Sequence, residues 1–208
     1  MGLKVLVVGA SSGIGLEVTK ALIKAGSKYE VFALVRNQEK ASKAIGADAS
    51  VVKFIHGDIT KKESLVAACR EMEALVCSVG AQAGWRLPGC DQYTPKYVDY
   101  IGVKNLIEAA VEARAEKALR EAFKEHDELA YYIVRPGGLN NKEGGQHGIV
   151  VEQGDTGMGS ITRQDVATVC VACINEESPP NVTFEILNDS KSPPGDLKVL
   201  STLVPDSL

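Results

Sequence analysis

Two patterns of apolar positions alternate along this chain. Short apolar runs rich in β-branched residues predict strands, and segments with an apolar residue at every third or fourth position predict helices. The first run, VLVV at residues 5–8, is apolar throughout, as in a strand covered on both faces of a parallel sheet. Similar runs predict strands at residues 30–35, 50–55, 73–79, 130–134, 149–152 and 181–187. With helical patterns among them, the order predicts an α/β fold built on a doubly wound parallel sheet.

Three glycines separate the first strand from the first helix. Gly9 allows a sharp turn, Gly13 allows the backbone to approach a ligand, and Gly15 allows the helix to pack closely against the strand. The free N–H groups at the start of the helix then face an anion such as a pyrophosphate, and Ser11 and Ser12 add hydroxyl donors. The strand–glycine–helix order predicts a dinucleotide-binding turn. The alternative is a tight turn in an ordinary α/β fold.

Two polar residues follow later strands at their carboxyl ends. An acidic residue after the second strand would bind the ribose hydroxyls of NAD, whereas Arg36, which occupies that position, suits the 2′-phosphate of NADP. The alternative for Arg36 is a solvated surface side chain. Asp58 follows the third strand, where it could accept a hydrogen bond from an adenine amino group or cap the helix that starts near Lys61.

The expected succession of strands and helices breaks after residue 113. The helical pattern at residues 96–113 continues directly into RAEKALREAFKEH, which is also helical and strongly charged, where a doubly wound sheet requires a fifth strand. As one helix, residues 96–126 would form a far longer crossover than a usual βαβ connection. We therefore expect that a strand-containing segment is missing near residues 113–114, by true deletion or by omission from the sequence.

The remaining patterns predict a single domain over residues 1–208, with a small substrate side from about residue 136 onward. Residues 82–95 and 140–148 are irregular and contain glycine, as in loops that line a cleft. The helix at residues 162–175 begins with Thr162 as N-cap and Asp165 three residues later, a near relative of the capping box.

The composition argues against nucleic-acid-binding and membrane-spanning proteins. The 208 residues are 45% hydrophobic, with a formal net charge of −4 and no block of basic residues, so nucleic-acid binding is not expected. No apolar run reaches the length of a membrane span, and the first strand leaves no room before it for a targeting segment. Both features predict a soluble protein of the cytoplasm or the plastid stroma.

The five cysteines are odd in number and scattered, which favours reduced thiols over a disulfide framework. Cys170 and Cys173 form a C-x-x-C, but they lie inside a helical pattern, and no second pair of cysteines or histidines completes a zinc site. We therefore expect no metal site.

Seven motifs occur in order between residues 3 and 187: GASSGIG, LVRN, HGDI, YVDYIGVKNLIEAA, YYIVRPGGL, ITRQDVA and FEI. Together they resemble the atypical short-chain dehydrogenase/reductases of the NmrA-like type, which are NAD(P)-binding proteins. The resemblance implies a Rossmann fold with NADP, in preference to NAD, lying across the sheet.

The resemblance also assigns the residues that contact the cofactor. It places the pyrophosphate on Gly9, Ser11, Ser12, Gly13 and Ile14. It places the 2′-phosphate on Arg36 and the adenine at Asp58 and Ile59. The ribose next to the nicotinamide falls at Ser78, Val79, Gly80 and Ala81, and the nicotinamide falls near Pro136 to Gly138.

Tyr100 and Lys104 match by spacing the Tyr-x-x-x-Lys pair of short-chain dehydrogenases. In that family the two side chains share one helix face, where the lysine lowers the pKa of the tyrosine so that it can donate a proton to a carbonyl. Here the pair precedes the expected fifth strand, whereas the family's catalytic pair follows it. A chance spacing of two surface residues is the alternative.

These features predict an NADP-dependent oxidoreductase that transfers a hydride between the cofactor and a small carbonyl or alkene. The alternative is a non-catalytic protein of NmrA-like type that senses NADP(H) and acts as a regulator or scaffold. Neither the substrate nor the oligomeric state is encoded in a recognisable motif, which leaves a homo-oligomer open.

Overall fold

The computed structural model describes residues 2–81, 94–120, 130–154, 157–176, 181–191, 193–194 and 197–206. The chain forms two compact units, Met1–Asp127 and Glu128–Leu208. Each unit has its own sheet. The prediction of one domain over residues 1–208, with a substrate side from about residue 136, stays a prediction.

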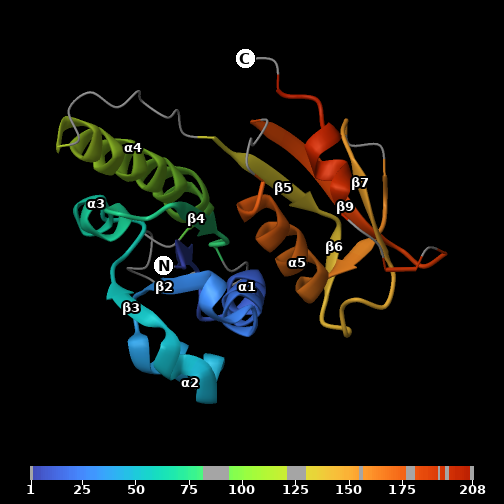
Figure 1. Cartoon of the computed structure of the whole chain (residues 1–208), viewed down its shortest axis with the longest axis horizontal. Coiled ribbons are helices and arrows are strands. Elements are labelled where there is room, and N and C mark those ends of the chain that lie inside the picture. Colours follow the sequence, from blue (N-terminus) through green and yellow to red (C-terminus); the bar gives the residue numbers. More distant parts are fainter. Residues whose placement is uncertain are drawn as a thin grey trace. The chain divides into compact units, whose positions relative to one another are not determined.

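Unit 1 is an alternation of strands and helices (Figure 1). Its strands are β1 (Leu3–Val8), β2 (Tyr29–Val35), β3 (Lys53–His56) and β4 (Ala74–Cys77). Its α-helices are α1 (Gly13–Lys24), α2 (Gln38–Ile45), α3 (Glu63–Cys69) and α4 (Val103–Arg120). Two 3₁₀ turns, η1 (Gly26–Lys28) and η2 (Ala47–Val51), and a π-helical segment, η4 (Lys96–Gly102), complete the unit.

The four strands of unit 1 form a parallel sheet in the order β3-β2-β1-β4. Because successive side chains of β1 point to opposite faces, Leu6 and Val8 face the cluster formed with α3 and α4. Val5 and Val7 point to the other face, where α1 contacts β1 and β2. All four side chains are buried. The doubly wound parallel sheet is therefore confirmed for this unit.

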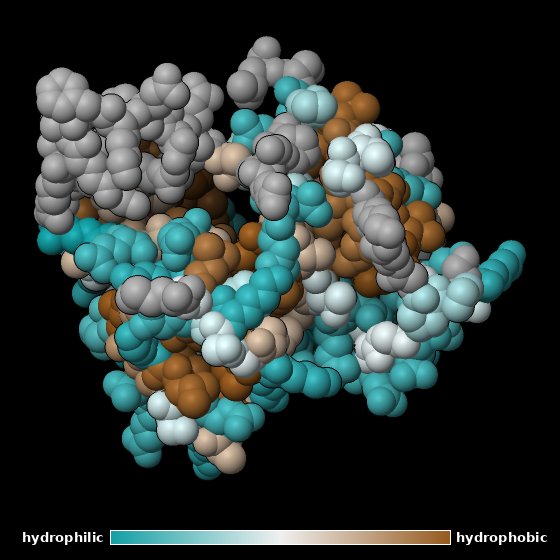
Figure 2. All heavy atoms as spheres, in the orientation of Figure 1, coloured by the Kyte–Doolittle hydropathy of each residue, from teal (hydrophilic) through white to brown (hydrophobic). Residues whose placement is uncertain are grey.

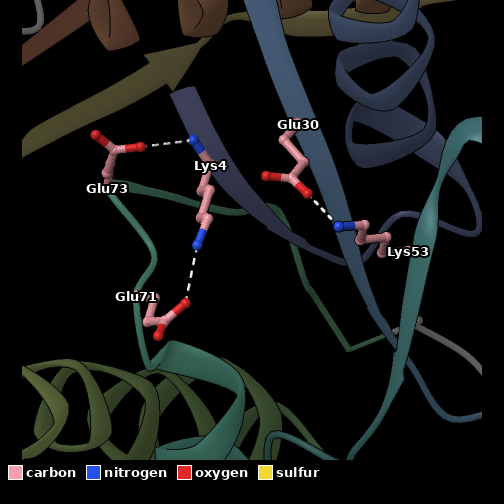
Figure 3. Close-up of polar contacts among 5 residues, drawn as sticks. All are labelled: Lys4, Glu30, Lys53, Glu71 and Glu73. Carbon is pink, nitrogen blue, oxygen red and sulfur yellow. Dashed lines mark hydrogen bonds and ion pairs between the residues drawn. The ribbon is translucent and has the colours of Figure 1, made fainter. Parts of the chain in front are cut away.

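The amino ends of these strands are tied together by charged groups (Figure 3). Lys4 Nζ, on β1, lies 2.8 Å from Glu71 Oε2, and the Lys4 backbone N–H donates to Glu73 Oε2 at 2.9 Å. Lys53 on β3 forms an ion pair with Glu30 on β2. The hydrogen bond to Glu71 raises the pKa of Lys4. Because such pairs are exposed, they align the strand ends and contribute little to stability.

Unit 2 contains the strands β5 (Tyr132–Pro136), β6 (Gly138–Asn140), β7 (Gly148–Glu152), β8 (Ser160–Thr162) and β9 (Val182–Asp189). It also contains the helix α5 (Arg163–Ile174) and the 3₁₀ turn η5 (Lys198–Thr202). One sheet has the order β5-β9-β7, with β5 parallel and β7 antiparallel to β9, and a second sheet joins β6 to β8. Hydrophobic side chains reach the surface of this unit around β7, β9 and η5 (Figure 2).

The core of unit 2 lies on one face of β9. Val182, Phe184 and Ile186 alternate along the strand and are fully buried, and the Tyr132 ring meets the Phe184 ring edge-on at 6.2 Å between centroids. The predicted cap of α5 is confirmed, since the Asp165 backbone N–H donates to Thr162 Oγ1 at 3.0 Å and Thr162 Oγ1 donates to Asp165 Oδ2 at 2.9 Å. Both side chains are buried, so the cap fixes where the helix begins.

Several predicted boundaries were wrong. The third strand covers Lys53–His56 instead of residues 50–55, because Gly46, at φ +89°, starts the 3₁₀ turn η2. The helix predicted at residues 96–113 begins with a π-helical segment and continues to Arg120. The strands β6 and β8 were missed, because each has only three residues, with glycine or polar side chains, and no periodic pattern. Residues 121–126 lie outside the described residues.

A first prediction concerns the core of unit 1. Leu6→Ala should lower the free energy of unfolding by about 3 kcal/mol, because it empties a fully buried position between α3 and α4. Urea denaturation of both proteins measures the difference. Val51→Ala is the matched control, since Val51 is mostly exposed and its loss should change stability by less than about 0.5 kcal/mol. Equal effects of the two substitutions would contradict the assigned core.

A second prediction concerns the carboxyl-terminal tail, which Asp206 fastens to β9. Its carboxylate accepts hydrogen bonds from the Thr183 backbone N–H at 3.0 Å and from Thr183 Oγ1 at 2.9 Å. Tyr131 Oη donates to it at 3.1 Å. These bonds, the Thr183 backbone bond first, hold the pKa of Asp206 below its ordinary value of 3.8.

Because folding lowers the pKa of Asp206, its charge stabilises the fold above the ordinary pKa, and this contribution is lost as the pH falls through the lower folded value. Asp206→Asn should therefore lower the melting temperature at pH 7, and the difference from the parent protein should shrink at about pH 3. Thermal unfolding of both proteins at the two pH values measures it. An undiminished difference at acid pH would overturn the assigned role.

Candidate nucleotide site

The candidate site lies along the carboxyl edge of the unit 1 sheet. The register sets Val8 of β1 opposite Leu34 of β2 and Cys77 of β4, and sets Val35 of β2 opposite His56 of β3. Because the four strands are parallel, the segments that follow them leave the same edge of the sheet. The glycine turn, Arg36, Asp58 and Ser78 are thereby brought to one edge, as the sequence predicted.

The three glycines of the first turn have different surroundings. Gly9 has φ +100°, a conformation that L side chains rarely adopt. At Gly15, an added Cβ would lie 2.3 Å from Ser78 Oγ and 2.4 Å from the Gly9 carbonyl oxygen. At Gly13, with φ +58°, an added Cβ would have no atom within 4 Å in the described part of the chain. Gly9 therefore forms the turn, Gly15 brings the helix close, and Gly13 borders open space.

The amino end of α1 is available to an anion. Ser12 is the N-cap, and its hydroxyl caps no amide of this helix in the described part of the chain. No acidic residue lies in the first turn of α1. Ser12 and Gly13 are exposed, and Ser11 and Ile14 are partly exposed. Since the first N–H groups of a helix have no partner within it, this end suits a phosphate.

Arg36 directly follows β2 and is exposed. Asn37, the next residue, caps α2 by accepting a hydrogen bond from the Lys40 backbone N–H at 2.8 Å. The cap fixes the chain direction immediately after Arg36. A guanidinium at this position has the charge and the planar donors that a phosphate requires.

The turn after β3 decides one of the two alternatives for Asp58, the helix cap, and the adenine contact stays a prediction. Its Oδ1 accepts hydrogen bonds from the Thr60 backbone N–H at 2.9 Å and from Thr60 Oγ1 at 2.8 Å, whereas α3 begins only at Glu63. Capping of a helix near Lys61 was therefore wrong, and Asp58 stabilises its own turn instead. The Ile59 side chain is buried in the core, so only its backbone remains for contact with a ligand.

The segment after β4 is held by two hydrogen bonds. Ser78 Oγ donates to the Val8 carbonyl at 3.2 Å, which ties the end of β4 to the end of β1. Asp99 Oδ1 accepts the Ala81 backbone N–H at 2.7 Å. Val79 packs against the core and Gly80 is exposed. Asp99 was missed by sequence reasoning because it lies 18 residues downstream of Ala81, with no motif linking the two.

The structure places the two catalytic candidates on the surface. Tyr100, in η4, is 68% exposed. Lys104, in α4, has its Nζ 3.8 Å from Glu108 Oε1 in an i,i+4 pair, and its side chain is also largely exposed. Among the described residues, no hydrogen bond joins Tyr100 to Lys104. Their catalytic role stays a prediction.

Two further parts of the predicted site are not described within unit 1. Pro136 is the last residue of β5 in unit 2, paired in register with Ile186. Residues 82–93, most of the expected cleft loop, lie outside the described residues.

Cys69, Cys170 and Cys173 have features of packing residues, whereas Cys77 is exposed. Cys69, Cys77, Cys170 and Cys173 carry free thiols. Burial raises the pKa of Cys69 and Cys170 to about 11 and that of Cys173 to about 12. These thiols are therefore protonated at neutral pH and are poor nucleophiles.

Comparison with known proteins supports the same assignment. The family model described as NAD(P)H-binding matches residues 9–119 and 112–177. This chain belongs to that NAD(P)H-binding family. The match confirms the predicted resemblance to NAD(P)-binding, oxidoreductase-like proteins of the NmrA-like type.

An uncharacterized chloroplastic protein of Arabidopsis thaliana is 28% identical over an alignment that covers 97% of this chain and 75% of the relative. Sanguinarine reductase of Eschscholzia californica is 26% identical over 88% of each chain. The solved structure of ChuY, an anaerobilin reductase from Escherichia coli, covers 91% of this chain and 99% of its own with a TM-score of 0.66 at 21% identity. This likeness confirms the Rossmann fold. Within the described residues, no helix combines the length and hydropathy that a membrane crossing requires.

A third prediction follows from the close packing of α1. Gly15→Ala should destabilise unit 1 by about 2–3 kcal/mol, because its methyl group would collide with the backbone of Gly9 and with Ser78. Gly26→Ala is the matched control: its φ of +69° costs about 1 kcal/mol, but open space surrounds the position. Chemical denaturation compares the two variants, and a Gly15→Ala cost no greater than that of Gly26→Ala would refute the close approach.

Proposed function

We propose that unit 1 binds NADP(H), with the pyrophosphate at the amino end of α1 and the 2′-phosphate at Arg36. The observation that carries the proposal is the glycine turn, in which Gly15 brings the helix close and Gly13 leaves space in front of it. The hydroxyls of Ser11 and Ser12 and the first backbone N–H groups of α1 would hold the phosphates. Arg36 supports NADP over NAD, because it stands where an acidic residue would otherwise bind the ribose.

The activity that we propose for the bound cofactor is hydride transfer to or from a small carbonyl or alkene. NADPH supplies a hydride when bound, and the protein positions it. Membership in the family and the relationship to sanguinarine reductase support this reaction class. The test is the loss of the reduced nicotinamide absorbance when the protein is mixed with NADPH and a panel of small ketones, quinones and conjugated alkenes.

A non-catalytic NADP(H)-sensing role is the second candidate. It is favoured by the exposure of Tyr100 and by the pairing of Lys104 with Glu108, since a catalytic tyrosine needs a lysine close to its hydroxyl. Nucleotide binding without turnover of any compound in the panel would support this candidate. For either role we propose a reducing compartment, the cytoplasm or the plastid stroma, consistent with the free thiols among the described residues and with the chloroplastic relatives.

A fourth prediction tests Arg36. Arg36→Asp should weaken NADPH binding by at least about tenfold, because the 2′-phosphate loses a charged donor and meets a carboxylate. Binding of NADH should change less than about threefold. Calorimetric titration with both nucleotides measures the two affinities.

Lys28→Asp is the control for Arg36→Asp, since it makes the same change of charge just before the amino end of β2. It should leave the preference for NADPH intact. If Arg36→Asp and Lys28→Asp alter NADPH binding equally, the 2′-phosphate assignment is wrong.

A further inference from the structure

Two strand edges in this molecule lack a partner among the described residues. β4 is the last strand of its sheet and pairs only with β1, and β5 is the first strand of its sheet and pairs only with β9. Both are parallel strands, which in α/β proteins normally lie inside a sheet. They are also consecutive along the chain in the described residues, with α4 between them.

The hydrogen-bond pattern of β5 shows which of its backbone groups point away from β9. The Tyr131 carbonyl accepts from the Val182 backbone N–H at 3.2 Å, and the Gly137 backbone N–H donates to the Ile186 carbonyl at 3.1 Å. In a parallel strand the two backbone groups of one residue point to the same side, and alternate residues point to opposite sides. The amides of Ile133 and Arg135 therefore point to β9, whereas those of Tyr132 and Val134 point to the open edge.

Apolar side chains beside these edges are also uncovered. Ile107 and Val111 lie one helical turn apart on α4, and each is more than half exposed, while Leu106 and Ala109 on the same helix are buried. On β5, Ile133 is half exposed on the face opposite the Phe184 core. A parallel sheet is normally covered by helices on both faces. An added helix would bury such positions.

The comparisons also indicate that residues are missing from this chain. The alignment with the Arabidopsis protein spans 253 positions, while 97% of 208 residues is about 202, so about 50 positions of the alignment have no residue in this chain. The family match is divided into two segments that overlap at residues 112–119, within α4, and we take this division as the place of the gap. About 50 residues are enough for one strand and one helix with their connections.

We infer that this chain lacks one strand–helix unit between α4 and β5, and that without it only the adenosine half of the nucleotide contributes to binding. This inference rests on the proposed nucleotide site. A dinucleotide spans two halves of a Rossmann sheet, the first of which holds the adenosine. Unit 1 contains that first half, and β4 is the final strand of its sheet. No described strand beyond β4 is therefore present to hold the nicotinamide half of the cofactor. A parallel strand at this point in the sequence would offer a pairing partner to the open edges of β4 and β5. The helix that follows it would cover the exposed side chains of Ile107 and Val111 on α4.

The experiment compares this chain with a chimera that carries, inserted at residues 112–119, a strand–helix segment taken from sanguinarine reductase. Hydrogen exchange tests the open edge. In the unmodified chain, the amides of Tyr132 and Val134 should exchange at least about 100-fold faster than those of Ile133 and Arg135, which serve as internal controls. The chimera should protect all four amides. Equal protection of the four in the unmodified chain would overturn the inference.

Calorimetric titration with NADPH and with 2′-phospho-ADP-ribose, which lacks the nicotinamide, tests whether the nicotinamide contributes to the binding affinity. The unmodified chain should bind the two within about threefold of each other, because the nicotinamide adds little, and the chimera should bind NADPH at least about tenfold tighter. A clear preference for NADPH in the unmodified chain would contradict the inference. If neither protein binds a nucleotide, the proposed function fails, and hydrogen exchange still decides whether a strand is lacking.

Discussion

The arrangement of unit 1 depends on the close approach of α1 to the ends of β1 and β4. Only a residue without a side chain fits at Gly15, because the Gly9 carbonyl and the Ser78 hydroxyl occupy the space that a Cβ would need. Ser78 in turn bonds to the Val8 carbonyl, so one small region joins two strands and a helix. The same approach directs the first amides of α1 toward the carboxyl edge. The close approach at Gly15 thus accounts both for the packing of α1 on the sheet and for the position of its anion-binding end.

The amino ends and the carboxyl ends of the unit 1 strands have different roles. At the amino ends, Lys4 pairs with Glu71 and Lys53 pairs with Glu30, while Glu73 accepts the Lys4 backbone N–H; these contacts align the strands (Figure 3). At the carboxyl ends, the turns are made by glycine, serine and short polar residues that leave backbone groups accessible. Charges satisfied within the protein have little left for a ligand, whereas unpaired helix N–H groups have no such partner. This contrast explains why the nucleotide is expected at the carboxyl edge alone.

The open strand edges at β4 and β5 help to distinguish between the two candidate functions, hydride transfer and nucleotide sensing. Hydride transfer requires that the reduced nicotinamide be held against a substrate. Adenosine recognition needs only the turns after β1, β2 and β3. A chain that lacks the support beyond β4 therefore has the features of a nucleotide sensor, and restoring that support would favour the oxidoreductase role of its family.

The sequence by itself determined the parallel order of unit 1, the glycine turn and the cap of α5, because each follows from local patterns: an apolar run, a spacing of glycines, or a Thr–Asp pair three residues apart. It also predicted a missing strand after residue 113, since two helical patterns there follow one another without a strand, and this stays a prediction. Only the tertiary structure decided that Asp58 stabilises its own turn, that Asp99 holds Ala81, and that β6 pairs with β8. These depend on residues brought together across the fold or on short irregular segments, for which neighbouring sequence carries no periodic signal.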